Sequence, residues 1–189
     1  MLSTFQMALH VPWLGQVGRA IVRRLAGFGC TRLLGVDPEA VAEGVEMVPL
    51  ATALAEADFV LVAVPLTSTT HHLIGATELA HARAGQLIVN VGRGSVVDEM
   101  AVLPALQSGQ VGGYAADVFG CEDWQLSDRP RTVSPELLAE PYTVFTPHIG
   151  SAVQHVRLAI EQSAADNIIA ALQGKTPPNA INAPQRLAA

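Results

Sequence analysis

Short apolar runs that alternate with helix-like segments are the feature that most constrains the fold of this chain. The runs are continuous and rich in branched side chains, and they occupy residues 31–36, 59–64, 86–91, 112–119 and, more weakly, 142–147. Strands of a parallel sheet that is covered on both faces have this composition, whereas half-exposed strands alternate apolar with polar residues. The pattern therefore predicts an α/β fold, a Rossmann-type doubly wound parallel sheet with right-handed crossovers.

Helical spacing of apolar residues marks the segments between and after these runs. The first segment starts near Val17 and should end at Gly27 and Gly29, and another covers residues 99–106 and should stop near Gly109. Both have the length expected of a crossover helix that packs on a sheet.

A longer helix should follow the last strand. Ser151 is its expected N-cap, Gln154 would complete a capping box, and Gly174 would end it. We therefore divide the chain into a dinucleotide-binding (Rossmann) domain, residues 1–150, and a C-terminal helix and tail, residues 151–189. A helix longer than the sheet needs is expected to pack on another domain or subunit.

Composition excludes several classes of protein. Half of the 189 residues are apolar and 15% are charged, so the chain can bury a core, and its net charge of −6 argues against binding to nucleic acid. The sequence shows no apolar run of membrane-spanning length and no basic and apolar leader. Cys30 and Cys121 match no metal or redox spacing, which favours free thiols in a reducing cytoplasm. His71 and His72 lack a third ligand nearby in sequence, so we predict surface residues and no metal site.

A glycine-containing turn at residues 11–20, "VPWLGQVGRA", follows a weak strand at residues 8–11 and opens the first helix. Its glycines, Gly15 and Gly18, suit the last two positions of the G-x-G-x-x-G turn that holds a dinucleotide pyrophosphate, but Trp13 occupies the first position. Asp37 ends the second strand, where an acidic residue binds a ribose hydroxyl. The turn predicts a dinucleotide site, and the alternative is a helix–strand junction that merely needs small residues.

Five motifs occur in the order seen in one enzyme family. They are "NVGRGSVVDE" at 90–99, "GGYAADVF" at 112–119, "EDW" at 122–124, "SDRP" at 127–130 and "FTPHIGSAV" at 145–153. The set resembles the D-isomer-specific 2-hydroxyacid dehydrogenases, and the "EDW" and "SDRP" motifs are most similar to the phosphonate (phosphite) dehydrogenases among them.

The resemblance implies an NAD-dependent oxidoreductase that transfers a hydride between a small anionic substrate, phosphite or a 2-hydroxy acid, and NAD. It further implies a homodimer formed through this domain, and an N-terminal substrate domain that this chain lacks. We expect no nucleic acid and no membrane among its partners.

The same resemblance suggests roles for individual residues. Arg93 would bind the substrate oxyanion, because a planar guanidinium suits a carboxylate or a phosphite, and His148 would be the general base. The alternatives are a surface arginine and a histidine that caps the next helix. Pro65 would line the cofactor, unless it simply ends a strand, and Asp117 would contact the nicotinamide carboxamide. The residues predicted to bind the cofactor are Gly15, Gln16, Val17, Gly18, Asp37, Pro65 and Asp117.

Gly120 departs from the family pattern as we align it. The resemblance places there a glutamate that orients the catalytic histidine, and glycine offers no carboxylate; Glu122, two residues later, is the alternative partner. Two functions therefore stay open. The chain is either the nucleotide domain of a truncated NAD-dependent dehydrogenase, or a non-catalytic module with a degenerate site that binds nucleotide or dimerises.

Overall fold

The computed structural model divides the chain into two compact units, Met1–Pro147 and His148–Ala189. Each unit is described by itself. The residues that the structure describes are 6–9, 15–30, 32–37 and 41–182.

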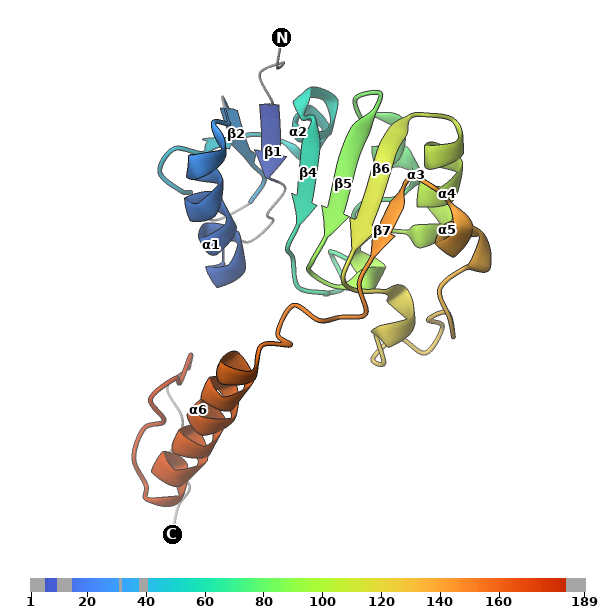
Figure 1. The fold of residues 1–189 in the computed structure, drawn as a ribbon. Coiled ribbons are helices and arrows are strands. Elements are labelled where there is room, and N and C mark those ends of the chain that lie inside the picture. The colour runs from blue at the N-terminus through green and yellow to red at the C-terminus, as the bar shows by residue number, and fades with distance from the viewer. Residues whose placement is uncertain (1–5, 10–14, 31, 38–40, 183–189) are drawn as a thin grey trace. The chain divides into compact units, whose positions relative to one another are not determined.

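Seven parallel strands form one sheet in the first unit, in the order β3-β2-β1-β4-β5-β6-β7 (Figure 1). From β1 the chain moves outward in one direction to β2 and β3, and then in the other direction from β4 to β7, as the doubly wound prediction requires. The strands are β1 (Gln6–Leu9), β2 (Arg32–Gly35), β3 (Glu46–Met47), β4 (Phe59–Val62), β5 (Gln86–Asn90), β6 (Val111–Ala116) and β7 (Thr143–Phe145).

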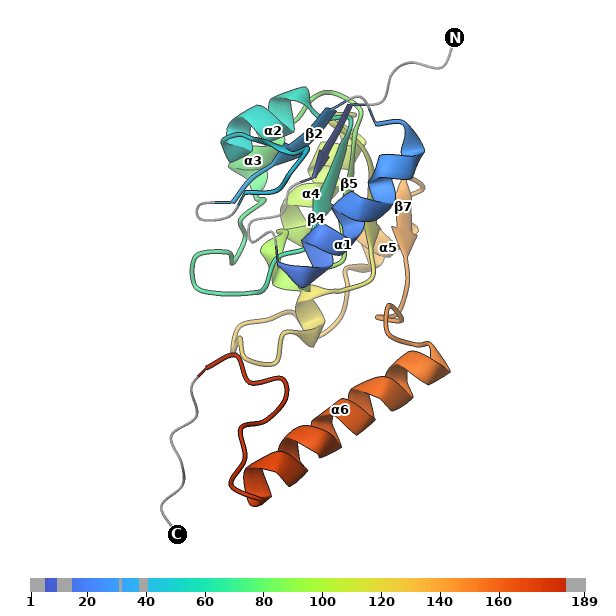
Figure 2. The same cartoon turned by 90° about the vertical axis from the view of Figure 1, so that its left-hand side faces the viewer.

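Helices cover the two faces of this sheet unequally. Helix α1 lies on one side of the sheet, and α2, α3 and α4 lie on the other (Figure 2). The helices of this unit are α1 (Gln16–Leu25), α2 (Leu50–Glu56), α3 (Ala76–Ala80), α4 (Glu99–Gln107) and α5 (Pro135–Ala139). The described residues of this unit also contain three short 3-10 helices: η1 (Ala26–Phe28), η2 (Gly94–Val96) and η3 (Gly120–Glu122).

The main core lies under α2, α3 and α4. Val60, Val62 and Ile88 point to this side of the sheet and are fully buried there. Their neighbours along the strands point to the other side, and of these Leu61 is only partly buried and Leu87 is 36% exposed. The prediction that the apolar strands are covered on both faces is therefore wrong for part of the sheet.

Glycines end the predicted helices, with one adjustment. Gly109 and Gly174 adopt the left-handed conformation that terminates a helix, as predicted. At the first helix, Gly29 is the left-handed C-cap, with φ +67°, whereas Gly27 lies inside η1. The chain therefore continues past Leu25 for one tight turn before it enters β2.

The second unit contains α6 (Gln154–Leu172), and its predicted N-terminal cap is wrong. Val153 is the N-cap, with no side-chain hydrogen bond, and Gln154 is already helical. The reason is local, because the Ala152 and Val153 amides donate to the carbonyls of Ile149 and Ser151 in a turn that places Ser151 too early. No residue of α6 is buried.

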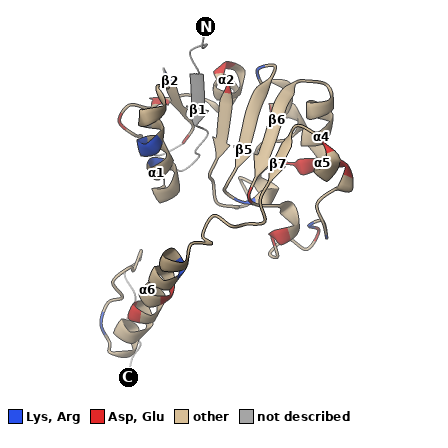
Figure 3. Cartoon of the chain, in the orientation of Figure 1, with Lys and Arg blue, Asp and Glu red and all other residues tan. Residues whose placement is uncertain are grey.

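Positively and negatively charged residues are interspersed along the described parts of both units (Figure 3). The helices in those parts include none that is long and apolar enough to cross a membrane.

Candidate functional site

A cavity of about 560 Å³ opens where β1 and β4, the two strands from which the chain moves in opposite directions, end. Parallel α/β sheets bind their ligands at this point of the topology, and the volume lies within the range of ligand pockets. Three segments meet here from different parts of the sequence. They are residues 15–18 at the start of α1, residues 63–66 after β4, and Arg93 after β5, with Gln125 beside them.

The glycine turn contributes the N-terminal end of α1. Gly18 is buried in the first turn of the helix, and the Gly15 carbonyl accepts the Arg19 amide at 3.0 Å. The amides of the first helical turn have no partner within the helix and carry partial positive charge, which suits a pyrophosphate. Pro12 and Trp13, the doubtful part of the predicted turn, lie outside the described residues.

A buried asparagine holds the loop that presents Arg93. Asn90, the last residue of β5, is completely buried, and its side chain donates to the Arg93 carbonyl at 3.0 Å and accepts from the Gly92 amide at 3.1 Å. A side chain at position 92 would not fit, because a Cβ there would lie 2.6 Å from the Val64 carbonyl oxygen. The loop is therefore fixed, while the Arg93 side chain itself is exposed and lines the cavity.

The remaining predicted cofactor residues lie at the same edge of the sheet. Pro65 lines the cavity, and its carbonyl accepts the Thr70 hydroxyl at 2.7 Å. Asp37 and Asp117 follow β2 and β6 and are partly buried, but neither belongs to the cavity lining. Asp117 accepts the Thr146 hydroxyl at 2.5 Å. The structure thus brings Gly15, Gln16, Val17, Gly18, Pro65 and Arg93 to one cavity and leaves Asp37 and Asp117 beside it.

His148 is the first residue of the second unit and comes three residues after the end of β7. Its side chain is exposed, and its backbone has a φ of +53°, a left-handed conformation that a residue other than glycine rarely adopts. Such strain persists only where the surrounding structure imposes it, and it is concentrated at functional sites.

A close joint ties the Arg93 loop to the loop of η3. The backbones touch at Gly94, where a Cβ would lie 1.8 Å from the Phe119 carbonyl carbon. The buried Asp123 carboxylate accepts the Ser95 amide at 2.8 Å, and Glu99 accepts the Gly120 amide at 2.9 Å. Burial is the first cause that raises the pKa of Glu99, and neighbouring carboxylates add to it.

Sequence reasoning missed Asn90, Glu99 and Asp123 as supports of this joint. All three fall inside the motifs that identified the site, and Asn90 also ends an apolar strand, where a buried polar side chain needs a partner. That position was the available signal.

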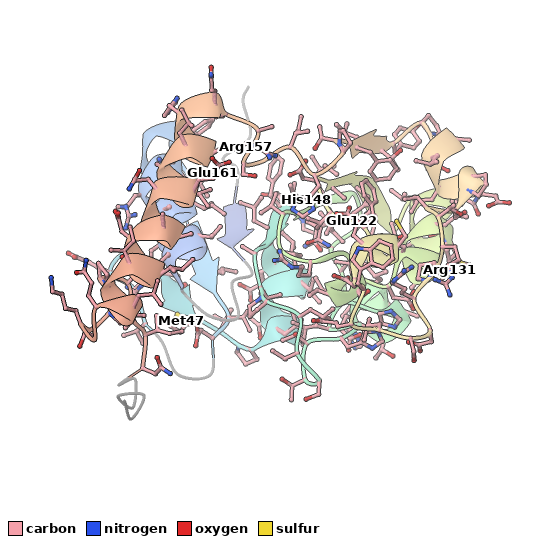
Figure 4. The ribbon with its side chains drawn as sticks, turned by 90° about the horizontal axis from the view of Figure 1, so that it is seen from below. Met47, Glu122, Arg131, His148, Arg157 and Glu161 are labelled. Atoms are coloured by element: carbon pink, nitrogen blue, oxygen red, sulfur yellow. The ribbon has the colours of Figure 1, made fainter. Side chains whose placement is uncertain are left out.

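Position 120 faces away from the Arg93 cavity. A Cβ on Gly120 would lie 3.4 Å from the Ser95 hydroxyl and 3.5 Å from Pro130 Cγ, and these residues line a different cavity. A glutamate at 120 would therefore start toward that second cavity, which does not support our alignment of the orienting carboxylate with this position. Glu122, on η3 (Figure 4), accepts the Phe119 amide at 3.1 Å.

The histidine pair and the two cysteines are the other residues that the sequence analysis considered as metal ligands. The described residues contain no group of three histidine, cysteine or acidic side chains that could hold a metal ion. His71 and His72 are exposed, and their rings stack with centroids 4.0 Å apart. In the described residues neither Cys30 nor Cys121 forms a disulfide bond, and each is partly buried.

Comparison with known proteins supplies the context of this site. Residues 5–150 match the NAD-binding domain of the D-isomer specific 2-hydroxyacid dehydrogenases. A glyoxylate/hydroxypyruvate reductase B from Erwinia tasmaniensis is 40% identical over 179 residues, which cover 92% of this chain and 54% of that protein. A glyoxylate reductase from Thermococcus litoralis is 36% identical, with 92% and 51% covered. The chain thus spans about half the length of the curated relatives it matches.

Solved structures of related enzymes have the same fold. The apo structure of D-lactate dehydrogenase from Escherichia coli superposes with a TM-score of 0.79 at 30% identity, over 96% of this chain and 56% of that one. An NAD-complexed D-isomer specific 2-hydroxyacid dehydrogenase from Lactobacillus delbrueckii, at 23% identity and a TM-score of 0.79, shares the fold over 94% of this chain and 56% of that one.

Proposed function

Since this chain belongs to the D-isomer specific 2-hydroxyacid dehydrogenases and corresponds to their NAD-binding domain, we propose that it is the cofactor-binding half of an NAD-dependent oxidoreductase acting on a small oxyanion. One observation carries the proposal. The glycine turn that suits a pyrophosphate and the arginine that suits an oxyanion line the same cavity, although they are separated by four strands in the sequence.

The residues of this cavity fit a dinucleotide. The amides at the start of α1 would hold the pyrophosphate, and Asp37 after β2 would accept hydrogen bonds from the adenosine ribose. Pro65 would line the cofactor, and Asp117 would contact the nicotinamide carboxamide. NAD, when bound, supplies the hydride acceptor. The chain's own residues must then place the substrate and move its proton.

Arg93 would place the substrate. Its loop is fixed by Asn90, and its Nη1 donates to the Gly92 carbonyl at 2.8 Å. The Nε and Nη2 donors would then hold two oxygens of a carboxylate or a phosphite at once. His148 would accept the proton released during oxidation, because imidazole titrates near neutrality. Glu122, not position 120, would be the carboxylate that orients this imidazole.

We propose phosphite as the substrate. The "EDW" and "SDRP" motifs, residues 122–124 and 127–130, favour it over the 2-hydroxy acids. For phosphite, the hydride leaves phosphorus, water supplies the oxygen that phosphorus gains, and His148 is the group available to take the proton of that water. Glyoxylate or hydroxypyruvate is the second candidate, because the curated relatives named above are reductases of these compounds.

The test joins this chain to the N-terminal substrate domain of a phosphite-oxidising relative and measures NADH formation from phosphite and NADH consumption with glyoxylate. We expect phosphite-dependent NADH formation that Arg93→Ala and His148→Ala each reduce by a factor on the order of 10² or more. Glu122→Gln should reduce it as well, whereas Gly120→Glu should bring no gain.

The outcomes separate the alternatives. Turnover of glyoxylate alone would overturn the phosphite assignment and keep the family chemistry. A chimera that binds NADH but turns over neither compound would favour the non-catalytic module.

Cofactor preference can be tested on the 189-residue chain itself. Asp37 would repel the 2′-phosphate of NADPH, and residues 36–44 contain no lysine or arginine to offset this repulsion. The guanidinium of Arg19, which reaches that loop, donates to the Val41 carbonyl at 3.5 Å. Calorimetric titration should therefore show NADH binding more tightly than NADPH. Equal or tighter binding of NADPH would contradict the role given to Asp37.

A further inference from the structure

A second cavity, of about 380 Å³, is lined by Ser95 and Gly120 from the joint between η2 and η3, and it shares no lining residue with the Arg93 cavity. Its wall is acidic, because it contains three carboxylates, Asp98, Glu99 and Asp128, against one imidazole, that of His72. Nothing in the proposed NAD chemistry uses these groups. The cavity lies wholly within the first unit, so all of its walls are placed relative to one another.

An unsatisfied hydroxyl is directed into this cavity. Ser95 is only 5% exposed, and its amide is bound to Asp123, but across the described residues its hydroxyl has no hydrogen-bond partner. The hydroxyl lies 3.4 Å from the point where a Cβ on Gly120 would stand, and Gly120 also lines the cavity. The hydroxyl is reached from the cavity, so it is available to a ligand group bound there.

Glu99 provides the negative charge. One of its oxygens accepts the Gly120 amide at 2.9 Å, and the charged groups that act on it are all carboxylates, namely Asp98, Glu122 and Asp123. A partly buried carboxylate among carboxylates is unfavourable unless it takes up a proton or a cation compensates it.

The arginines near this wall do not supply that cation. Arg129 lies over the Trp124 ring, 4.0 Å from its centroid, and Arg131 is exposed on the loop that carries Pro130 (Figure 4). Within residues 41–182, neither guanidinium forms an ion pair with the carboxylates of the cavity.

We propose that this cavity binds an organic ammonium group carried on a short hydrocarbon chain. Glu99 and the Ser95 hydroxyl would receive the ammonium hydrogens, and Val97, Met100 and Pro130 would contact the hydrocarbon. A bare metal ion is disfavoured, because the described carboxylates and imidazoles are not grouped closely enough to ligate one, and the cavity is far larger than an ion. The ligand is a free amine or a lysine side chain, which share this chemistry.

The test uses the 189-residue chain labelled with ¹⁵N and titrated with n-butylammonium chloride, with 1-butanol and sodium chloride as probes that lack either the charge or the chain. We expect saturable shifts of the amides of Ser95, Met100 and Gly120 with butylammonium only. Nα-acetyl-lysine methylamide distinguishes the two sources. Tighter binding than butylammonium identifies a lysine side chain, and equal or weaker binding identifies a free amine.

Two variants and a control make the result specific. Glu99→Gln keeps an acceptor for the Gly120 amide but removes the charge, and it should weaken butylammonium binding about tenfold or more. Ser95→Ala should weaken it several-fold. Glu43→Gln makes the same chemical change on an exposed loop and should have no effect.

The proposal is overturned if butylammonium and butanol give the same shifts, if no saturable shift appears at these amides, or if Glu99→Gln binds as the unmodified chain does. A thermal melt of each variant confirms that it is folded. This result is independent of whether the chain turns over phosphite.

Discussion

The two faces of the sheet in the first unit differ in how well they are buried, although their sequences are equally apolar. Under α2, α3 and α4 the register partners Val60 and Ile88 are fully buried. On the α1 side, Ile21 and Val22 pack near Leu61 and Ala63, and all four remain partly buried. The row of side chains that contains Leu61 continues across β5, β6 and β7 with Val89, Ala115 and Val144. At the end of this row, Val144 is 67% exposed.

This difference shows that apolar composition and contribution to stability are separate properties of a strand. Residues that point toward α2, α3 and α4 stabilise the folded unit, because they leave water completely. Those on the α1 side have the composition of a core but add less to the stability of this unit. The supports of the candidate site, Asn90 and Asp123, are both buried, and Asn90 lies in the same row of side chains as Val62 and Ala116. The well-buried face therefore also determines the geometry of Arg93.

Gly94→Ala should have the largest effect, because its new Cβ would lie 1.8 Å from the Phe119 backbone. Backbone atoms in a buried joint cannot yield, so we expect a loss of about 4 kcal/mol or more in the free energy of unfolding. Gly27→Ala is the matched control, since a Cβ at Gly27 meets nothing within 4 Å. Urea denaturation measures both. Equal stability of the two variants would contradict the close backbone contact between Gly94 and Phe119.

Ile88→Ala and Leu87→Ala compare the two faces at adjacent residues of one strand. Ile88 is fully buried and Leu87 is 36% exposed. We expect a loss of about 2–5 kcal/mol for Ile88→Ala and about 1 kcal/mol or less for Leu87→Ala in the same denaturation experiment. Similar losses would mean that the α1 side is as well buried in solution as the opposite side.

Asp123→Ala should cost about 1–3 kcal/mol, because the buried Ser95 amide would lose its acceptor. Asp123→Asn retains a carbonyl oxygen and should lose less. Amide hydrogen exchange at Ser95 reports the bond directly, and exchange should accelerate in Asp123→Ala but much less in Asp123→Asn. Unchanged protection in Asp123→Ala would show that the amide is held by another group.

Glu99→Gln should have the smallest effect and one that depends on pH. Burial raises the pKa of Glu99 above its ordinary value of 4.5, so the folded chain binds this proton more tightly than the unfolded chain does. The carboxylate therefore lowers stability progressively as pH rises above about 4.5, and the penalty is complete above the raised pKa. The stability of Glu99→Gln relative to the parent chain should increase from pH 4.5 to pH 7. A difference that does not change with pH would contradict the shift.

Some of this structure could be predicted from the sequence and some could not, for a physical reason. Branched apolar runs and helix-ending glycines act over a few residues, so β2, β4 to β7, α1 and α4 were foreseen within a few residues of their bounds. The two-residue β3 and the short helices α2, α3 and α5 give no comparable local signal.

The candidate site divides in the same way. Gly15, Gly18 and Arg93 follow from motif spacing, and the structure places them at one cavity. Asn90 bonds to Gly92 and Arg93 within its own motif. Gly94 and Asp123, in contrast, act through partners that the fold brings near, 28 residues away in sequence for Asp123 and Ser95. No local pattern records such a pairing, and the unequal burial of the two faces is likewise a property of the assembled unit.

The short strands at the two edges of the sheet disfavour self-association of this apolar chain by strand pairing. The strands at the two edges, β3 and β7, have two and three residues, and they are the shortest of the sheet. An edge this short exposes few unpaired amide and carbonyl groups to a strand from another molecule. On β3, Glu46 also forms an ion pair with Arg32 of β2, which keeps a charge at that edge. Growth of the sheet into a fibril by strand addition is therefore disfavoured at both ends, even where side chains such as Val144 remain in contact with water.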